Sequence, residues 1–163
     1  MIEAGELERI AHGLYQDPNE FNDPYVEAQH TCRQGIFSNV TALYFHDLSD
    51  QTPLRLMLTI PSGYNCRLLK DKKGFKFFYL KPELHEMGIS TVITPFGHAV
   101  KVYDLERTIC DCIKMEDHLD KNTVVQALKA YFGYGVVDYA TLLGYAEKLK
   151  IRKRVKMLME VLT

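Results

Sequence analysis

The sequence predicts an α+β fold, in which a small mixed or antiparallel sheet is followed by a C-terminal helical layer. Three observations lead to this prediction. Segments in which apolar and polar residues alternate, as they do in strands, lie before residue 104. From residue 104 onward, apolar residues recur at helical spacing. The chain has 163 residues, of which 47% are hydrophobic and 25% charged, which suits a domain with its own core.

The N-terminal region is expected to contain two short strands and then a helix. Residues 7–10 and 12–15 have strand-like sequences, and residues 16–22 form a turn-rich linker. Asp23 is a suitable N-cap residue, and Pro24 suits the first position of a helix that we expect to continue to about residue 33.

Alternating apolar residues predict most of the sheet. A helix is expected to begin at Ser38 or Asn39, and residues 82–87 can form one helical turn. The predicted strands cover residues 54–60, 75–80, 89–94 and 99–103, and residues 36–37 are also extended. These segments predict a sheet of about four strands.

The strand at residues 99–103 runs directly into a helix that joins the two halves of the chain. Asp104 is a good N-cap residue, because its carboxylate can accept hydrogen bonds from the free N–H groups of the first helical turn. Arg107, Asp111 and Lys114 are expected on the face opposite the apolar one. The predicted apolar stripe consists of Leu105, Ile109, Cys112 and Ile113.

Three more amphipathic helices are expected after this one. Asp120 caps the first of them, with Gly133 just past its end, and Asp138 caps the second. The apolar face of the last helix consists of Val155, Leu158, Met159 and Leu162.

Charge and cysteine spacing restrict the possible functions. The net charge is −1, so binding to nucleic acid or membrane would need a local patch. The four cysteines have no C-x-x-C spacing and no His pair nearby, which predicts no metal, no other cofactor and a reducing compartment. A signal peptide and membrane-length apolar runs are both missing, so we expect a cytoplasmic protein with no membrane partner.

Glu106, Arg107 and Asp111 form the most conspicuous polar group, and a catalytic or partner-binding cluster is one interpretation. We favour a simpler one, in which Arg107 and Asp111 pair on the helix surface, four residues apart, and hold the helix to the sheet. No nucleophile or base is spaced to act with them.

Motifs of nucleotide-transferring enzymes are missing from the sequence. A nucleotidyltransferase would need paired aspartates after a Gly-Ser turn, but Ser62-Gly63 leads into Tyr64-Asn65-Cys66. The phosphate-binding loop G-x-x-x-x-G-K-[ST] is also missing, and the six histidines are scattered. The sequence therefore predicts a protein that is not an enzyme.

Two basic patches could recognise an anion, either DNA phosphate or an acidic surface on a protein. The first straddles the start of the last helix and consists of Lys148, Lys150, Arg152, Lys153, Arg154 and Lys156. The second surrounds an expected hairpin turn at Gly74 and consists of Lys70, Lys72, Lys73 and Lys76. For either patch alone, a merely solvated surface is the simpler interpretation.

Several segments resemble, in the same order, those of the AbiEi family of antitoxins and transcriptional regulators from bacterial type IV toxin–antitoxin (abortive infection) systems. The most specific segment consists of Tyr103, Asp104, Leu105, Glu106, Arg107, Thr108, Ile109, Cys110 and Asp111. Other similar segments are residues 5–15, 35–48 and 53–64 and the turn Thr94-Pro-Phe-Gly97.

The resemblance implies an antitoxin that counteracts a nucleotidyltransferase toxin and regulates its own operon. It assigns residues 1–16 to a residual wing of a winged helix-turn-helix, with Arg9 and His12 as residues that contact DNA, and residues 17–163 to the antitoxin domain. Because the helices expected before the wing are missing, the resemblance implies weak, non-specific DNA binding and impaired autoregulation. The alternatives are a degenerate nucleotidyltransferase-like enzyme and a non-functional, truncated regulator.

Overall fold

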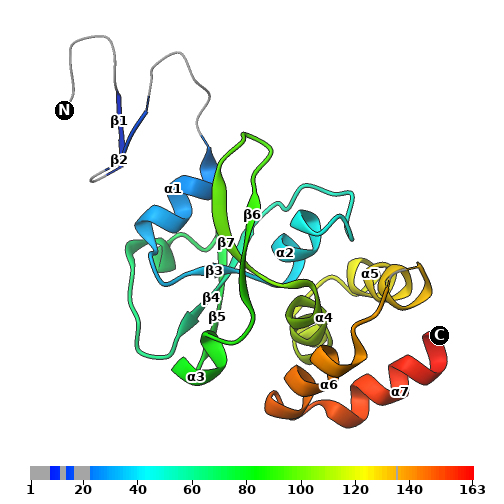
Figure 1. Ribbon diagram of the computed structural model, residues 1–163. Helices are drawn as coiled ribbons and strands as arrows, with labels where there is room; N and C mark the ends of the chain where they lie inside the picture. The colour runs from blue at the N-terminus through cyan, green and yellow to red at the C-terminus, as the bar shows by residue number, and fades with distance from the viewer. Residues whose placement is uncertain (1–7, 12–13, 17–22, 135) are drawn as a thin grey trace.

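A computed structural model describes residues 8–11, 14–16, 23–134 and 136–163. Near the N-terminus, β1 (Glu8–Ala11) and β2 (Leu14–Gln16) pair as an antiparallel hairpin, which confirms the two predicted strands. The rest of the chain forms a five-stranded sheet and a group of C-terminal helices (Figure 1). The predicted α+β class is therefore correct, and the division of the chain at residue 16 stays a prediction.

The five-stranded sheet is mixed, with strand order β5-β4-β3-β7-β6. Antiparallel pairs join β3 to β4 and β6 to β7, and parallel pairs join β3 to β7 and β4 to β5. The strand bounds are β3 (Ile36–Phe37), β4 (Leu56–Pro61), β5 (Phe75–Leu80), β6 (Ile89–Ile93) and β7 (Ala99–Tyr103). The predicted number of about four strands was too low. Residues 36–37 were predicted only to be extended, but they form β3, the central strand of the sheet.

The expected hairpin turn at Gly74 was wrong. Strands β4 and β5 are parallel, with Leu56 opposite Phe75 and Pro61 opposite Leu80. The chain returns between them through residues 62–74, which include the 3-10 helix η1 (Arg67–Lys70). A connection of this length is what a parallel pair requires. Gly74 instead closes a turn in which its N–H donates to Asp71 at 3.0 Å.

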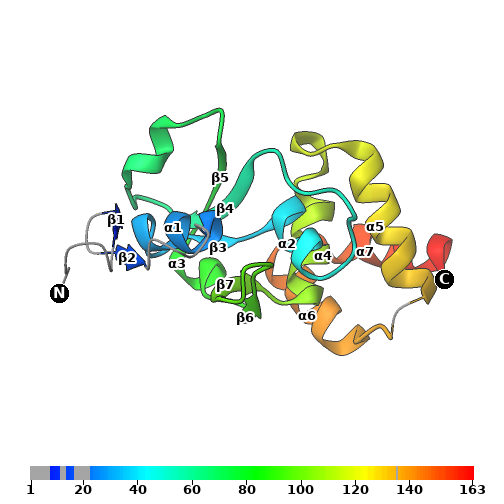
Figure 2. The ribbon, with the colours of Figure 1, turned by 90° about the horizontal axis from the view of Figure 1, so that it is seen from above.

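Helices α1 (Pro24–Thr31) and α2 (Asn39–Phe45) bury the apolar side chains of the sheet. Asp23 caps α1 as predicted, accepting hydrogen bonds from the N–H groups of Tyr25 and Val26. Tyr25, Phe37 and Phe45 pack edge to face, with ring centroids 5.0–5.8 Å apart. Figure 2 shows the β1–β2 hairpin at one end of the molecule and the C-terminal helices at the other, with α1 and the sheet between them.

The C-terminal layer packs around α4 (Leu105–Lys114), where Ile109 and Ile113 are fully buried. Asp104, Asp120 and Asp138 accept hydrogen bonds from N–H groups of first helical turns, as predicted for N-caps. The expected end before Gly133 was wrong, since α5 continues to Tyr134. The remaining helices are α3 (Pro82–His85), α5 (Lys121–Tyr134), α6 (Tyr139–Lys148), α7 (Arg152–Leu162) and the 3-10 helix η2 (Glu116–His118). Among the described residues, no helix has the length and apolar character needed to cross a bilayer.

The turn between α6 and α7 places Lys150 in the left-handed region, with φ of 63°. The N–H of Ile151 donates to the carbonyl of Ala146 at 2.8 Å, and that of Lys150 to Glu147 at 3.1 Å. These two bonds define a Schellman motif, in which glycine is the preferred residue at the position of Lys150.

Replacing Lys150 with glycine should therefore stabilise the protein. We expect the free energy of unfolding to rise by about 0.5–1 kcal/mol, because glycine removes the steric cost of the left-handed conformation. Urea denaturation measures the change. Lys148→Gly is the matched control, since Lys148 is the last residue of α6 and its replacement should lower the free energy of unfolding, by up to about 1 kcal/mol. Equal losses in both variants would contradict the assignment of the turn.

Candidate functional site

The family-like segment at residues 103–111 is buried at the centre of the protein. Arg107 is 0% exposed, and its guanidinium lies over the ring of Tyr103, 4.0 Å from the centroid. It donates from Nε to Asp111 at 3.0 Å and from Nη1 to the carbonyls of Leu84 at 2.6 Å and Met87 at 2.5 Å. Arg107 therefore joins α4 to the last residue of β7 and to the segment around α3.

The predicted ion pair between Arg107 and Asp111 is confirmed, but its predicted position on the helix surface was wrong. Both side chains are buried, because α4 is covered on its polar side as well as on its apolar side. Burial raises the pKa of the Asp111 carboxyl, and the charge of Arg107 opposes this shift. Arg107 Nη2 and Asp111 Oδ2 are buried without a hydrogen bond to any described residue.

The other polar residues of this segment are also engaged inside the protein. The hydroxyl of Tyr131 on α5 donates to Glu106 at 2.9 Å, and that of Tyr145 on α6 donates to Asp104 at 2.6 Å. Thr108 donates to the carbonyl of Tyr103 at 3.2 Å. The segment therefore fixes three helices against one another, and this arrangement favours a structural role over a catalytic one.

His85, at the end of α3, is buried beside this group. Its Nε2 lies 2.6 Å from the carbonyl of Gln34 and donates to it, while the hydroxyl of Tyr103 donates to the carbonyl of His85 at 2.6 Å. Burial lowers the pKa of the ring below its ordinary value of 6.5, and the charge of Arg107 acts in the same direction. The folded protein therefore favours a neutral His85.

A neutral, buried His85 should make the protein less stable in acid. As the pH falls through about 6.5, the unfolded chain binds a proton before the folded chain does, so the free energy of unfolding falls. The contribution of one histidine is at most about 1.4 kcal/mol per pH unit. Urea denaturation at pH 7.5, 6.5 and 5.5 gives the free energy of unfolding at each pH. This free energy should fall less steeply with decreasing pH for His85→Gln than for wild type. Equal slopes would mean that His85 ionises equally in both states.

The basic patch at the α6–α7 turn is divided by the structure into two groups. Arg152 pairs with Glu147 at 3.3 Å. Arg154 donates to the carbonyl of Ile113 at 2.8 Å and forms an ion pair with Glu116. These two arginines therefore have intramolecular partners. The remaining cations are exposed, and we call them the lysine face: Lys148, Lys150, Lys153 and Lys156.

The four lysines flank, in the sequence, a helix start that lacks a side-chain cap. The N-cap residue of α7 is Ile151, so its side chain cannot accept from the N–H groups of the first turn. The first residues of α7 are instead Arg152, Lys153 and Arg154, whose charges are unfavourable at the positive end of the helix dipole. Free N–H groups and lysines close together are the elements of a surface that binds anions.

The second basic patch contains one lysine with intramolecular contacts. Lys76 donates to the carbonyl of His118 and lies 5.7 Å from the centroid of the Phe78 ring. Burial lowers its pKa, and the charge of Arg55 acts in the same direction. Lys70, Lys72 and Lys73 are exposed along the turn before β5. They offer a matched control for charge variants of the lysine face.

The expected DNA-contacting residues at the N-terminus are only partly described. Arg9 lies in β1, opposite Tyr15 of β2. His12 lies outside the described residues. The contact of either residue with DNA stays a prediction.

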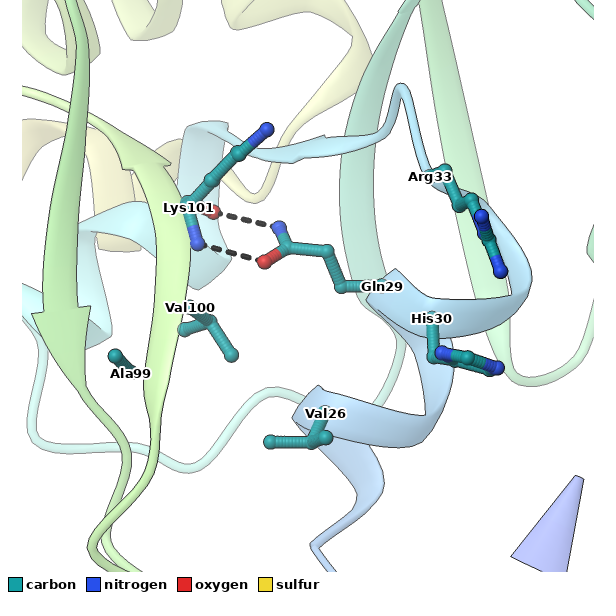
Figure 3. A pocket seen from close by; sticks show the side chains of 7 residues that line it. All are labelled: Val26, Gln29, His30, Arg33, Ala99, Val100 and Lys101. Atoms are coloured by element: carbon teal, nitrogen blue, oxygen red, sulfur yellow. Dashed lines mark hydrogen bonds between the residues drawn. The ribbon is translucent and has the colours of Figure 1, made fainter. Parts of the chain in front are cut away.

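A groove between α1 and β7 was not predicted from the sequence. Its volume is about 350 Å³, and Gln29 lies across it (Figure 3). The amide of Gln29 donates to the carbonyls of Lys101 at 2.9 Å and Gly35 at 3.1 Å, and accepts from the N–H of Lys101 at 2.7 Å. It therefore satisfies backbone groups of β7 as a neighbouring strand would. A single glutamine in a helix carries no sequence signal for such a contact.

A second network joins α1 to the turn between β6 and β7. The carboxylate of Asp23 accepts from the hydroxyl of Thr94 at 2.6 Å and lies 2.8 Å from Nδ1 of His98. Gly97 has a φ of 91° and donates its N–H to the carbonyl of Thr94 at 2.9 Å. The family-like turn Thr94-Pro-Phe-Gly97 therefore has a structural explanation. No group of three metal-binding side chains occurs among the residues that the structure describes.

Comparison with protein-family models gave no match, and a search of curated proteins also gave none.

Proposed function

We propose that this protein is a non-enzymatic, cytoplasmic antitoxin that counteracts a nucleotidyltransferase toxin through the lysine face. The observation that supports the proposal best is the lysine face itself, with four exposed lysines around one turn. The resemblance of residues 103–111 to AbiEi antitoxins suggests which kind of system the protein serves.

The charges of the lysine face favour binding of an anionic partner. Four like charges around one turn repel one another, and each is worth little to the free protein. A partner with acidic groups or phosphates would replace this repulsion with attraction, and would also find the uncapped N–H groups of α7. The toxin or its nucleic-acid substrate could supply such groups, and both routes would counteract the toxin.

The roles of the acidic residues support a protein without catalytic activity. Catalysis by a nucleotidyltransferase depends on carboxylates that hold divalent metal ions. The acids of the family-like segment accept hydrogen bonds from side chains of this protein: Asp104 from Tyr145, Glu106 from Tyr131 and Asp111 from Arg107. These acids therefore stabilise the fold. Purified protein with magnesium, nucleoside triphosphates and RNA should transfer no nucleotide.

Co-expression with a nucleotidyltransferase toxin, which the proposal expects to be encoded next to the gene of this protein, tests the proposal. Cells that make both proteins should grow as cells without the toxin do, and cells that make the toxin alone should stop growing. Failure of the folded protein to restore growth, or nucleotide transfer that one Asp or Glu substitution abolishes, would contradict the proposal.

DNA binding by the 163-residue chain should be weak and independent of sequence. Lysines that contact phosphates carry no sequence information, and their contribution depends on salt. If all four lysines of the lysine face contact phosphates, the slope of log K against log salt concentration should be about −3 to −4. Fluorescence anisotropy with promoter and scrambled DNA measures both properties. Lys153→Gln with Lys156→Gln should reduce the slope, whereas a preference for promoter DNA would contradict this account.

A further inference from the structure

Strand β6 is the last strand of the sheet on the side of β7. Among the described residues, only β7 pairs with it, in a continuous register that runs from Ile89 to Ile93. Figure 2 shows β6 on the outer side of β7. Ile89 and Ile93 are 40% and 64% exposed, and Ser90 and Thr91 are exposed as well. This edge of the sheet is therefore open.

The hydrogen bonds to β7 show which backbone groups of β6 face the open edge. The N–H of Asp104 donates to the carbonyl of Gly88 at 2.8 Å, and the N–H of Thr94 donates to that of His98 at 2.7 Å. In an antiparallel pair, residues that exchange hydrogen bonds alternate with residues that do not. The even-numbered residues of β6 therefore face β7, and the N–H and C=O groups of the odd-numbered ones point outward. We call the latter the edge residues: Ile89, Thr91 and Ile93.

Strand β6 lacks the features that usually protect an open edge from pairing with another strand. Protected edges carry charged side chains, prolines or bulges. The sequence of β6 is Ile-Ser-Thr-Val-Ile, which has no charge and no proline. Strand β5, at the other edge of the sheet, carries Lys76, and the side chain of Arg55 donates to the carbonyl of Phe75 at 2.9 Å. Of these two edges, β6 is therefore better suited to accept a further strand.

We propose that β6 is a dimerisation surface, at which two copies of this chain pair through the same strand. In an antiparallel pair centred on Thr91, Thr91 lies opposite its own copy, and Ile89 of each chain lies opposite Ile93 of the other. All three are edge residues, so each pair exchanges two N–H···O bonds. Any other twofold register places an edge residue opposite a position outside β6. The strand is therefore complementary to itself in this one register.

The side chains also favour this register. The edge residues share one face of the sheet, and the register brings together β-branched side chains in Ile–Ile and Thr–Thr pairs, which stabilise antiparallel strands. The one charged residue of β7 is Lys101, which lies opposite Thr91. Its two copies would be three strand spacings apart, roughly 14 Å, where salt largely screens their repulsion.

Sedimentation equilibrium of the full chain tests the inference. Because one short strand makes a small interface, we expect a reversible dimer at protein concentrations from roughly 10 μM to 1 mM. Thr91→Lys places like charges opposite each other at the centre of the pair, so it should raise the dissociation constant at least about tenfold. Tyr79→Lys is the matched control, since it adds a lysine at an exposed position of β5 and should dimerise as wild type does.

Cross-linking locates the contact independently of these lysine variants. Thr91→Cys, treated with a short bismaleimide, should give a covalent dimer in which position 91 is joined to its copy, because the paired Cα atoms lie about 5.5 Å apart. Tyr79→Cys should give no link between the two copies of position 79. A wild-type chain that stays monomeric throughout, or a dimer that Tyr79→Lys dissociates and folded Thr91→Lys does not, would overturn the inference.

Discussion

Replacing Arg107 with methionine should lower the free energy of unfolding by about 3–5 kcal/mol. Methionine fills part of the same volume but leaves the Asp111 carboxyl buried without its partner. It also leaves the carbonyls of Leu84 and Met87 without the hydrogen bonds that they accept from Arg107. Urea denaturation followed by circular dichroism measures the loss.

A double variant separates the missing charge partner from the loss of packing. Arg107→Met with Asp111→Leu removes both charges, so it should recover part of the stability lost by Arg107→Met alone. Lys114→Met is the control for removal of a cation from the same helix, because Lys114 is only partly buried. If Arg107→Met and Lys114→Met have equally small effects, Arg107 does not hold the helices together.

Ile109→Asp should prevent folding. The side chain of Ile109 is 0% exposed within the C-terminal core, so aspartate would place a charge where neither water nor a cation can reach it. The expected loss of about 5 kcal/mol or more is comparable with the whole stability of an ordinary domain. The variant should show no cooperative thermal transition.

Ile109→Val is the matched control at this position. It removes one methyl group from the same site and should cost only about 0.5–1.5 kcal/mol. A cooperative melt of Ile109→Asp near that of wild type would show that α4 is not buried as described.

Local signals in the sequence predicted the caps and most element bounds correctly. Asp23, Asp104 and Asp138 each precede a predicted helix, and capping depends only on residues within the first turn. Strand β5 also has the bounds that were predicted for it, Phe75–Leu80. These features could be predicted because their causes lie within a few residues.

Contacts between distant segments could not be predicted in this way. Arg107 was expected on the surface because helical spacing does not reveal that Tyr103, Leu84 and Met87 cover the polar side of α4. The parallel pairing of β4 and β5 depends on how the chain crosses over, which strand periodicity does not encode.

The lysine face was only partly predicted from the sequence. The density of basic residues at positions 148–156 was visible in the sequence. The separation of Arg152 and Arg154 from the four lysines was not, because it depends on Glu147, Glu116 and the carbonyl of Ile113. The candidate site is therefore smaller than the patch from which it was predicted.

Growth during co-expression with the toxin, compared between two charge-reversed variants, tests the role of the lysine face most directly. One variant replaces Lys148, Lys150, Lys153 and Lys156 with glutamate. The control replaces four other exposed lysines with glutamate: Lys70, Lys72, Lys73 and Lys129. Because both variants replace four lysines, the change in net charge is the same. Circular dichroism melts establish that both are folded. We predict that the control restores growth and that the lysine-face variant does not. Equal rescue by both folded variants would contradict the account.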